Sequence, residues 1–179
     1  MVGADEERIE TERLILRTHR AEDIDAYQPL WTAAPGERMF TPVLDAEGAW
    51  ARLLRLIGHR EVFGWAPFLV EERGSGRIVG EAGFARFRRS VGQGFDEAPE
   101  AMWILSRETR GTGYGREATA AAFAWFDRRM PGTRSVAMID PANAASLRLA
   151  EIHGFTAYGR THRHDTDLVL FERVLRTPR

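Results

Sequence analysis

The sequence contains no cysteine and no lysine among its 179 residues. The absence of cysteine excludes disulfide bonds, thiolate metal sites and a cysteine nucleophile. The absence of lysine excludes a Walker A loop, which needs a lysine after its last glycine. No apolar run reaches the length of a membrane-spanning helix, and a formal net charge of −1 provides no basic footprint for nucleic acid. We therefore expect a protein that binds neither membranes nor nucleic acid.

The remaining composition is that of an ordinary globular protein, with 44% hydrophobic and 28% charged residues. A chain of this length can bury a sizeable core, and no linker or internal repeat divides it. We expect a single domain spanning residues 1–179. The first twelve residues are acidic and polar, unlike a signal peptide, so a cytoplasmic enzyme is the expectation.

Hydrophobic periodicity and turn residues predict seven strands and four helices. The expected strands cover residues 13–17, 65–71, 77–87, 100–105, 135–139, 155–158 and 168–174. The expected helices cover residues 21–31, 47–59, 116–129 and 143–153. The order is thus one strand, two helices, three strands, a helix, a strand, a helix and two strands.

A glycine-rich hexamer, Arg-Gly-Thr-Gly-Tyr-Gly at residues 110–115, connects an expected strand to an expected helix. Such a turn exposes backbone N–H groups at a helix N-terminus, where the helix dipole also favours anions. Arg110 adds a planar group suited to phosphate oxygens. A dinucleotide fingerprint would require glycine at the position of Arg116. The hexamer therefore indicates a pyrophosphate site of another kind, with a simple tight connection as the alternative.

Arg110, Gly113 and Gly115 match the pattern Arg/Gln-x-x-Gly-x-Gly, which resembles the acetyl-CoA loop of the GNAT superfamily of N-acetyltransferases. The order of the expected elements is similar to that superfamily over nearly the whole chain. The resemblance implies a three-layer α/β fold whose central sheet is mixed and mostly antiparallel, with about seven strands and helices on both faces. It also implies acetyl-CoA as co-substrate and no metal.

Three further segments resemble the branch that includes the ribosomal-protein N-terminal acetyltransferases, the RimJ/RimL type. They are Thr-Glu-Arg-Leu-Ile-Leu-Arg at 11–17, Ile-Val-Gly-Glu-Ala-Gly at 78–83, and Asn-Ala-Ala-Ser at 143–146 followed by Glu-Ile-His-Gly-Phe at 151–155. Ile152 stands where the branch usually has lysine, and His153 stands at a usually apolar position. We expect neither change to affect cofactor binding.

The resemblance implies two main-chain sites for the cofactor. The pyrophosphate site comprises Arg110, Gly111, Thr112, Gly113, Tyr114 and Gly115. The main chain of Trp103, Ile104 and Leu105 is expected to pair with the pantetheine arm and to supply oxyanion donors. Asn143 has two compatible interpretations, a helix N-cap or a partner of the pantetheine arm. Ser146 is either another hydroxyl of the first helical turn or a partner of the CoA sulfur or of a water.

Two carboxylates, Glu81 and Glu100, are candidates for the general base. Glu81 lies within an expected strand, and Glu100 begins the strand that leads to the glycine-rich loop. Burial would raise the pKa of either carboxylate and make it a better base. The alternative for both is an exposed carboxylate paired with an arginine.

The sequence offers no tyrosine as general acid, because the tyrosine that many GNAT enzymes use has no counterpart here. Leu149 and Ala150 occupy that neighbourhood of the sequence. Tyr158 is the nearest tyrosine, and we expect it only to pack on its strand. This leaves Ser146 or water as the group that protonates the leaving thiolate.

The acceptor is expected near four residues, which are Trp31, Phe40, His164 and Asp165. The resemblance places the loop that carries His164 and Asp165 over the acceptor cleft. The same loop also holds His162 and Asp167, but without a partner motif elsewhere we expect a solvated hairpin and no metal.

Together these features predict an N-acetyltransferase that moves an acetyl group from acetyl-CoA to a primary amine. Direct attack in a ternary complex is expected, because no cysteine is available as a nucleophile. The acceptor is a protein N-terminus or a small-molecule amine. The alternatives are an acyltransferase for a longer acyl-CoA and a non-catalytic module that senses CoA or another ligand. Many relatives dimerise, so a homodimer remains open beside a monomer.

Overall fold

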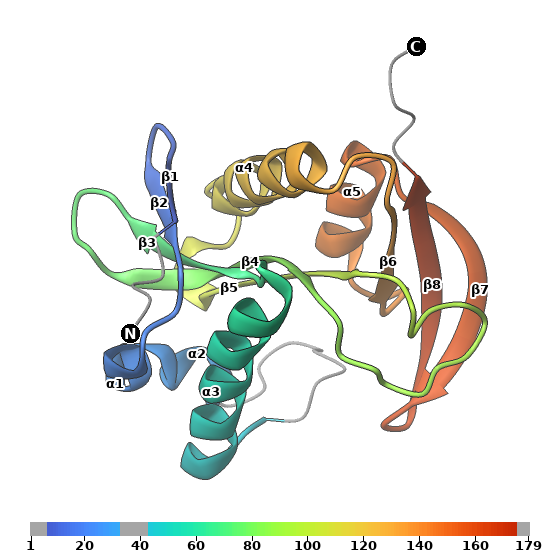
Figure 1. The fold of residues 1–179 in the computed structure, drawn as a ribbon, viewed down its shortest axis with the longest axis horizontal. Helices are drawn as coiled ribbons and strands as arrows, with labels where there is room; N and C mark the ends of the chain where they lie inside the picture. The colour runs from blue at the N-terminus through green and yellow to red at the C-terminus, as the bar shows by residue number, and fades with distance from the viewer. Residues whose placement is uncertain (1–6, 33–42, 175–179) are drawn as a thin grey trace.

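The computed structural model describes residues 7–32 and 43–174, and its centre is an eight-stranded sheet. The strands are β1 (Arg8–Glu10), β2 (Leu14–Arg17), β3 (Phe68–Glu72), β4 (Ile78–Ala85), β5 (Glu100–Leu105), β6 (Arg134–Ile139), β7 (Thr156–Arg163) and β8 (Thr166–Val174). Their spatial order is β1-β2-β3-β4-β5-β6-β8-β7 (Figure 1). All neighbouring pairs are antiparallel except β5 and β6, which are parallel.

The helices follow the expected order. They are the 3-10 helix η1 (Ala21–Asp23), α1 (Ile24–Tyr27), α2 (Pro29–Thr32), α3 (Ala46–Phe63), the 3-10 helix η2 (Arg107–Thr109), α4 (Tyr114–Arg129) and α5 (Ala144–Ile152). The expected first helix over residues 21–31 is divided into three short pieces. Pro29, which has no backbone N–H, begins the last of these pieces.

The seven expected strands are all present, and β1 is an eighth that the sequence did not reveal. β1 pairs with β2 through its main chain, with Ile9 opposite Leu16. Only Ile9 packs against the core, whereas Arg8 and Glu10 are exposed. The segment therefore lacks the hydrophobic alternation that identifies most strands.

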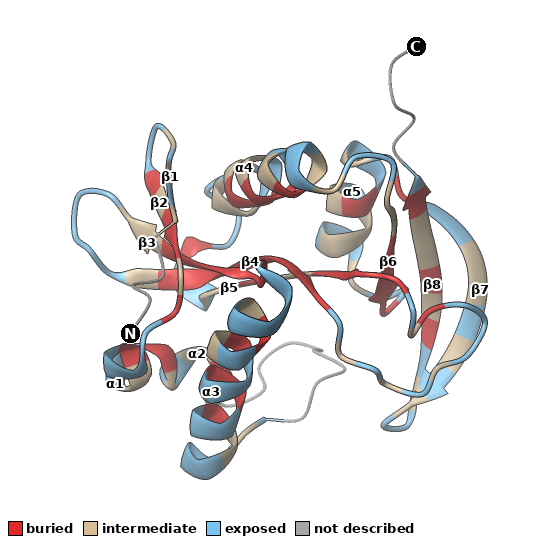
Figure 2. Cartoon of the chain, viewed as in Figure 1, coloured by how far each residue is buried: buried red, intermediate tan, exposed pale blue. Residues whose placement is uncertain are grey.

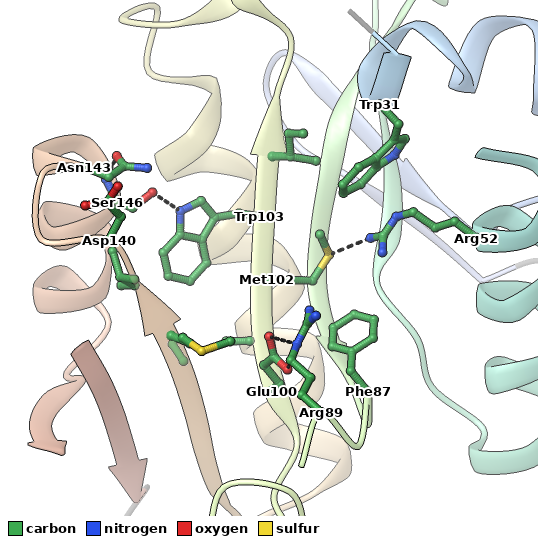
Figure 3. Close-up of a pocket in the computed structure, with 15 residues that line it drawn as sticks. Trp31, Arg52, Phe87, Arg89, Glu100, Met102, Trp103, Asp140, Asn143 and Ser146 are labelled. Carbon is green, nitrogen blue, oxygen red and sulfur yellow. Dashed lines mark hydrogen bonds and ion pairs between the residues drawn. The ribbon is translucent and has the colours of Figure 1, made fainter. Parts of the chain in front are cut away.

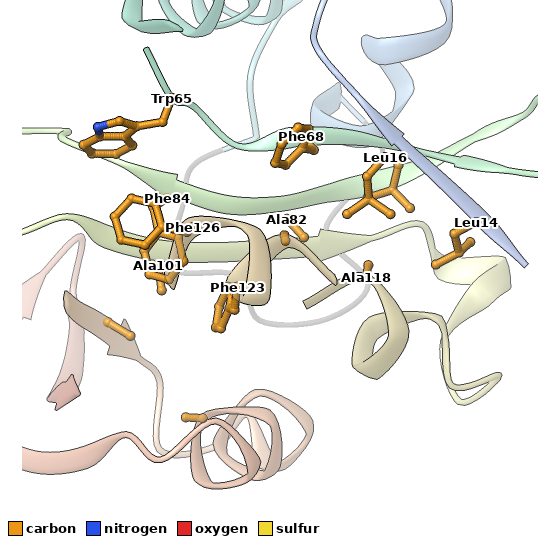
Figure 4. Close-up of a cluster of buried hydrophobic side chains, with 14 of the residues drawn as sticks. Leu14, Leu16, Trp65, Phe68, Ala82, Phe84, Ala101, Ala118, Phe123 and Phe126 are labelled. Atoms are coloured by element: carbon orange, nitrogen blue, oxygen red, sulfur yellow. The ribbon is translucent and has the colours of Figure 1, made fainter. Parts of the chain in front are cut away.

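Two layers of helices cover the sheet, so the expected three-layer mixed α/β fold is confirmed. Helices α4 and α5 lie on one side of the central strands and α3 lies on the other (Figure 1). On the α4 side, Phe84 stacks on Phe126 at 4.1 Å and packs against Phe123 at 4.6 Å between ring centroids (Figure 4). On the α3 side, a second cluster includes Leu53 and Ile104. Strands β4 and β6 are the most continuously buried strands of the sheet (Figure 2).

The parallel strands β5 and β6 separate almost as soon as they meet. Their ladder contains one residue pair, Glu100 opposite Val136. On its other edge, β5 pairs with β4 continuously from Glu100 opposite Ala85 to Leu105 opposite Gly80. The edge of β5 that faces β6 therefore has no strand partner after Glu100.

A buried polar network joins the α3 layer to the sheet. The side chain of Glu81 on β4 is completely buried. One carboxylate oxygen accepts hydrogen bonds from His19 Nε2 at 2.7 Å and from the Tyr27 hydroxyl at 3.0 Å, and the other accepts from Arg52 Nη2 at 2.8 Å. Burial by itself raises the pKa of Glu81, but the charge of Arg52 and the bond from His19 outweigh it and lower the pKa to about 2.

The substitution Glu81→Gln should lower the free energy of unfolding by about 3 kcal/mol, because it leaves the buried Arg52 without its counter-charge. Urea denaturation at pH 7 measures the change, with Glu61→Gln on the exposed face of α3 as the matched control. Because the pKa of Glu81 is lowered, its stabilisation is present above pH 4.5 and is lost as the pH falls toward 2. The variant should lack this part of the acid dependence, and a stability equal to that of Glu61→Gln would contradict the network's role.

Candidate functional site

A cleft occupies the space between β5 and β6 (Figure 3). Its walls come from β5, from β6 with the start of α5, and from α2, α3 and the segment that follows β4. The lining residues are Trp31, Arg52, Phe87, Arg89, Glu100, Ala101, Met102, Trp103, Ile104, Ala137, Met138, Ile139, Asp140, Asn143 and Ser146. Six of them were singled out from the sequence: Trp31, Glu100, Trp103, Ile104, Asn143 and Ser146.

The glycine-rich loop lies just beyond the end of β5, between η2 and α4. Gly111 and Gly113 adopt positive φ angles of 80° and 88°, which L side chains rarely adopt. Gly113 is the N-cap of α4, and no side chain caps this helix. The first N–H groups of a sixteen-residue helix are therefore left for another acceptor. Arg110 and Thr112 are exposed beside them.

Side chains from distant parts of the sequence hold this loop in place. Arg13 donates from Nη1 to the Thr112 carbonyl at 2.9 Å and from Nε to Glu117 Oε2 at 2.7 Å. Its guanidinium also lies 4.8 Å from the centre of the Tyr114 ring. The Tyr114 hydroxyl in turn donates to Glu72 Oε1 at 2.8 Å. Tyr114 thus anchors the loop to β3, a role that the sequence pattern did not show.

Gly115 provides close packing between the loop, β5 and α5. A Cβ atom at this position would lie 3.4 Å from Leu149 Cδ1 and 3.6 Å from Leu105 Cδ2. Leu149, which stands in the neighbourhood where many GNAT enzymes have a tyrosine, is thus directed toward Gly115. α5 therefore contributes no tyrosine hydroxyl to the residues that line the cleft.

The start of α5 faces β5 across the open end of the cleft. Asn143 Oδ1 accepts a hydrogen bond from the Ser146 N–H at 3.0 Å, which confirms the N-cap interpretation of Asn143. The Ser146 hydroxyl oxygen accepts from Trp103 Nε1 at 3.1 Å (Figure 3). Because Ser146 Oγ is the acceptor in this bond, its own hydrogen can be donated to another group. Among the described residues no acceptor for that hydrogen is found.

Glu100 occupies the point at which β5 and β6 diverge. Only 4% of the residue is exposed, and both carboxylate oxygens accept from Arg89 Nε, at 3.0 and 2.8 Å. Burial raises the pKa of Glu100 above its usual value even though the charge of Arg89 opposes that change. A buried carboxylate with a raised pKa that lines a cleft has the properties of a general base.

Glu81 has a different environment, although the sequence made it an equal candidate. It does not line the cleft, and both of its oxygens are occupied by His19, Tyr27 and Arg52. Its lowered pKa also weakens it as a proton acceptor. The geometry therefore argues against Glu81 as the base, and its evident role is to hold Arg52 in position.

The candidate acceptor residues are only partly brought together. Trp31 lines the cleft, but Phe40 lies outside the described residues. His164 and Asp165 form the exposed turn between β7 and β8, with φ angles of 47° and 58°, and they are not among the cleft residues. Tyr158 packs against a separate apolar cluster, as expected.

Arg52, Phe87 and Arg89 are among the nine residues of the cleft that the sequence did not single out. Arg52 lies on the buried face of α3, at helical spacing from the apolar residues Leu53 and Leu56. A charged residue at an apolar position of the helical period was the signal that the sequence offered. Phe87 and Arg89 follow β4 in an irregular segment, where no periodic pattern indicates which side chains turn inward.

Two negative observations apply to residues 7–32 and 43–174. No three histidine or carboxylate side chains there are grouped so that they could hold a metal ion. In the same ranges, no helix combines the length and apolar character that crossing a membrane requires.

Comparison with known proteins gives a consistent result. Residues 13–156 match the family model described as an acetyltransferase (GNAT) domain. A GNAT-family acetyltransferase from Bordetella pertussis is 32% identical, with a TM-score of 0.84 over 93% of this chain and 99% of that one. The RimL ribosomal L7/L12 α-N-protein acetyltransferase in complex with coenzyme A is 19% identical, with a TM-score of 0.76 over 94% and 98% of the two chains.

A third structure adds to the same picture. The ribosomal-protein-S5-alanine acetyltransferase from Vibrio fischeri is 20% identical, with a TM-score of 0.72 over 94% of this chain and 96% of that one. Comparison with curated sequences gives no significant match. The family match covers most of the chain and agrees with the sheet, the glycine-rich loop and the cleft between β5 and β6. The chain therefore belongs to the GNAT acetyltransferase family.

Proposed function

We propose that this protein transfers an acetyl group from acetyl-CoA to a primary amine by direct attack in a ternary complex. The observation that carries the proposal is the free edge of β5, which begins at Glu100 and runs to the glycine-rich loop. One surface thus joins a buried carboxylate to an uncapped helix N-terminus. Acylation of an amine needs both a proton acceptor and a held acyl donor.

The loop over residues 110–115 suits a pyrophosphate. The N–H groups at the start of α4 lack a side-chain cap, and the helix dipole favours an anion at this end. A Cβ atom added to Gly111 would meet nothing within 4 Å, so the surface beside it is open. Arg110, Thr112, Gly113, Tyr114 and Gly115 complete this proposed site, with Arg13 as its support.

The free edge of β5 suits the pantetheine arm. Main-chain groups of Trp103, Ile104 and Leu105 have no strand partner on the β6 side, so an extended chain can pair with them as an added strand. Asn143 keeps its amide nitrogen available after its oxygen caps α5. The same N–H groups of β5 can stabilise the oxyanion of the reacting carbonyl.

Acetyl-CoA supplies the acyl group as a thioester. Glu100 accepts a proton from the amine, directly or through a water, so that the nitrogen lone pair can form the new C–N bond. As the C–S bond breaks, Ser146 can donate its hydroxyl hydrogen to the leaving sulfur, and the second proton that the acylated nitrogen loses can return to Ser146 through water. A single domain over residues 1–179 provides all of these groups, in a monomer or a homodimer.

The acceptor is a small-molecule amine or a peptide N-terminus. Several structural neighbours bear names of ribosomal-protein acetyltransferases. Their similarity to this chain is one of fold, and this similarity is the only support for a peptide acceptor over a small-molecule amine. A longer acyl-CoA or a sensing role would require the same loop. Catalysis is favoured over sensing because Glu100 is a buried carboxylate with a raised pKa inside the cleft.

The substitution Gly113→Glu should abolish cofactor binding, because a carboxylate would occupy the N-terminus of α4 where the phosphates are held. For the wild type, acetyl-CoA at one hundred times its Kd should stabilise the fold by about 2.7 kcal/mol. Thermal shift with acetyl-CoA, CoA, ATP and NAD measures the effect. Gly132→Glu is the matched control, because Gly132 also has a positive φ of 73° but follows the other end of α4. Equal stabilisation of both variants by acetyl-CoA would refute the loop assignment.

The substitution Glu100→Gln should lower kcat by about 10² to 10⁴-fold while CoA binding is retained. In the wild type, kcat/KM should rise with pH through the raised pKa of Glu100, since only the ionised carboxylate accepts a proton. The variant should lose this acid limb. Thiol release measures the rates, with the exposed neighbour Glu97→Gln as control. Retention of the full rate by Glu100→Gln would exclude it as the base.

A further inference from the structure

The α3 side of the cleft carries a cluster of cationic side chains around Phe87. The guanidinium carbons of Arg89, Arg55 and Arg52 lie 4.5, 5.3 and 5.8 Å from the centre of its ring. Arg52 also stacks on Trp31, with its guanidinium carbon 3.7 Å from that ring centre. We call Arg52, Arg55 and Arg89 the arginine cluster.

Carboxylates neutralise only part of this cluster. Glu81 pairs with Arg52, and Glu100 pairs with Arg89. In the described part of the chain, Arg55 has no ion-pair partner. The remaining acidic residue of the cleft, Asp140, lies on the opposite wall and accepts a hydrogen bond from the Ala142 N–H. Arg55 is exposed and does not line the cleft, so its positive charge lies outside the cleft, on the α3 side beside Phe87.

The same wall contains hydrogen-bond donors that lack acceptors. Arg52 and Trp31 are more than nine-tenths buried, and neither Arg52 Nε nor Trp31 Nε1 has a partner among the described residues. The terminal nitrogens of Arg89, whose side chain is 20% exposed, also make no hydrogen bond within the described ranges, and they point toward Met102 (Figure 3). Buried donors without acceptors are costly, so their concentration at one wall points to a ligand that supplies the acceptors.

We propose that the acceptor substrate carries a carboxylate a few bonds from its reactive amine. The carboxylate lies against Trp31, Arg52 and Arg89, while the amine faces Glu100. This inference rests on the proposed acetyl transfer and specifies its substrate class. A carboxylate fits because it offers several acceptor lone pairs and a negative charge to guanidinium and indole N–H donors.

The distance between Arg52 and Glu100 agrees with such a substrate. Arg52 Nη2 lies 4.0 Å from the sulfur of Met102, which is two residues from Glu100 on the same face of β5. Two residues of a strand span about 7 Å. An α-amino acid places its nitrogen and a carboxylate oxygen about 3 Å apart, and a hydrogen bond of about 2.8 Å at each end completes the distance. A compact amino carboxylate can therefore reach both groups at once.

The test compares acids with their uncharged carboxamides. The twenty free amino acids and their amides are supplied as acceptors, beside dipeptide amides that have glutamate or glutamine as the second residue. Acetyl transfer is measured as thiol release, and binding is measured as thermal shift of the CoA-saturated protein. The comparison of free amino acids with their amides detects a small-molecule acceptor. The comparison of the glutamate dipeptides with the glutamine dipeptides detects an acidic peptide. In at least one set, the acid should be preferred over its amide by about tenfold or more in kcat/KM.

The variant Trp31→Phe removes the indole N–H together with its five-membered ring and keeps a six-membered aromatic ring beside Arg52. It should reduce the acid preference by about threefold to tenfold through a raised KM for the acid. Trp50→Phe is the matched control, because Trp50 lies on α3 but is 39% exposed and does not line the cleft. Arg52→Lys, which keeps a cation beside Glu81 but lacks Nε, should also reduce the preference.

The outcomes distinguish this inference from the proposed function. Amides that bind and react as well as their acids would overturn the carboxylate site while leaving acetyl transfer intact. An acid preference that is identical in Trp31→Phe and the wild type would overturn the assigned wall. If no amine is acetylated but acids still stabilise the CoA-saturated protein more than amides do, acetyl transfer fails and the carboxylate site is supported.

Discussion

The separation of β5 from β6 is the constraint on which the rest of the site depends. A parallel pair that remained hydrogen-bonded would satisfy the main chain of β5 and close the sheet. Here the ladder ends with Glu100 opposite Val136, while β4 continues to hold the other edge of β5. β5 is thus held in the sheet by one edge, and the main-chain groups of its other edge are unpaired. This asymmetry provides main-chain hydrogen-bonding groups within a rigid sheet, without a flexible loop.

The opening must be held at a fixed width, and two sets of contacts do this. On the α5 side, Trp103 bonds to Ser146 across the gap. On the α3 side, Glu81 fixes Arg52 against the sheet, together with His19 and Tyr27. A buried charge network of this kind adds little net stability compared with apolar packing, but it specifies one arrangement of its members. Here that arrangement presents a cationic and aromatic wall to the cleft.

Local features of the sequence predicted what depends on local structure. The glycine-rich loop, the Asn143 cap and the order of strands and helices follow from turn chemistry and periodicity within short windows. The two carboxylates could not be distinguished in this way, because Glu81 and Glu100 both lie on strands. Their difference comes from Arg52, which is 29 positions from Glu81, and from the divergence of two strands. The sequence did not predict β1, because this strand is defined by its main-chain pairing with β2 and lacks a hydrophobic pattern.

The attachment of the glycine-rich loop to Arg13 has a consequence for folding. The bonds from Arg13 to Thr112 and Glu117 connect residues 99 and 104 positions apart. Contacts of such high sequence separation require closure of a long loop, and they form only when distant segments have docked. A nascent or partly folded chain that has β4, β5 and α4 but not a docked β2 lacks this support. A ligand that binds the supported loop therefore binds the fully folded chain in preference to a partly folded one. Its affinity depends on the docking of Arg13 and β2 as well as on the chemistry of the loop.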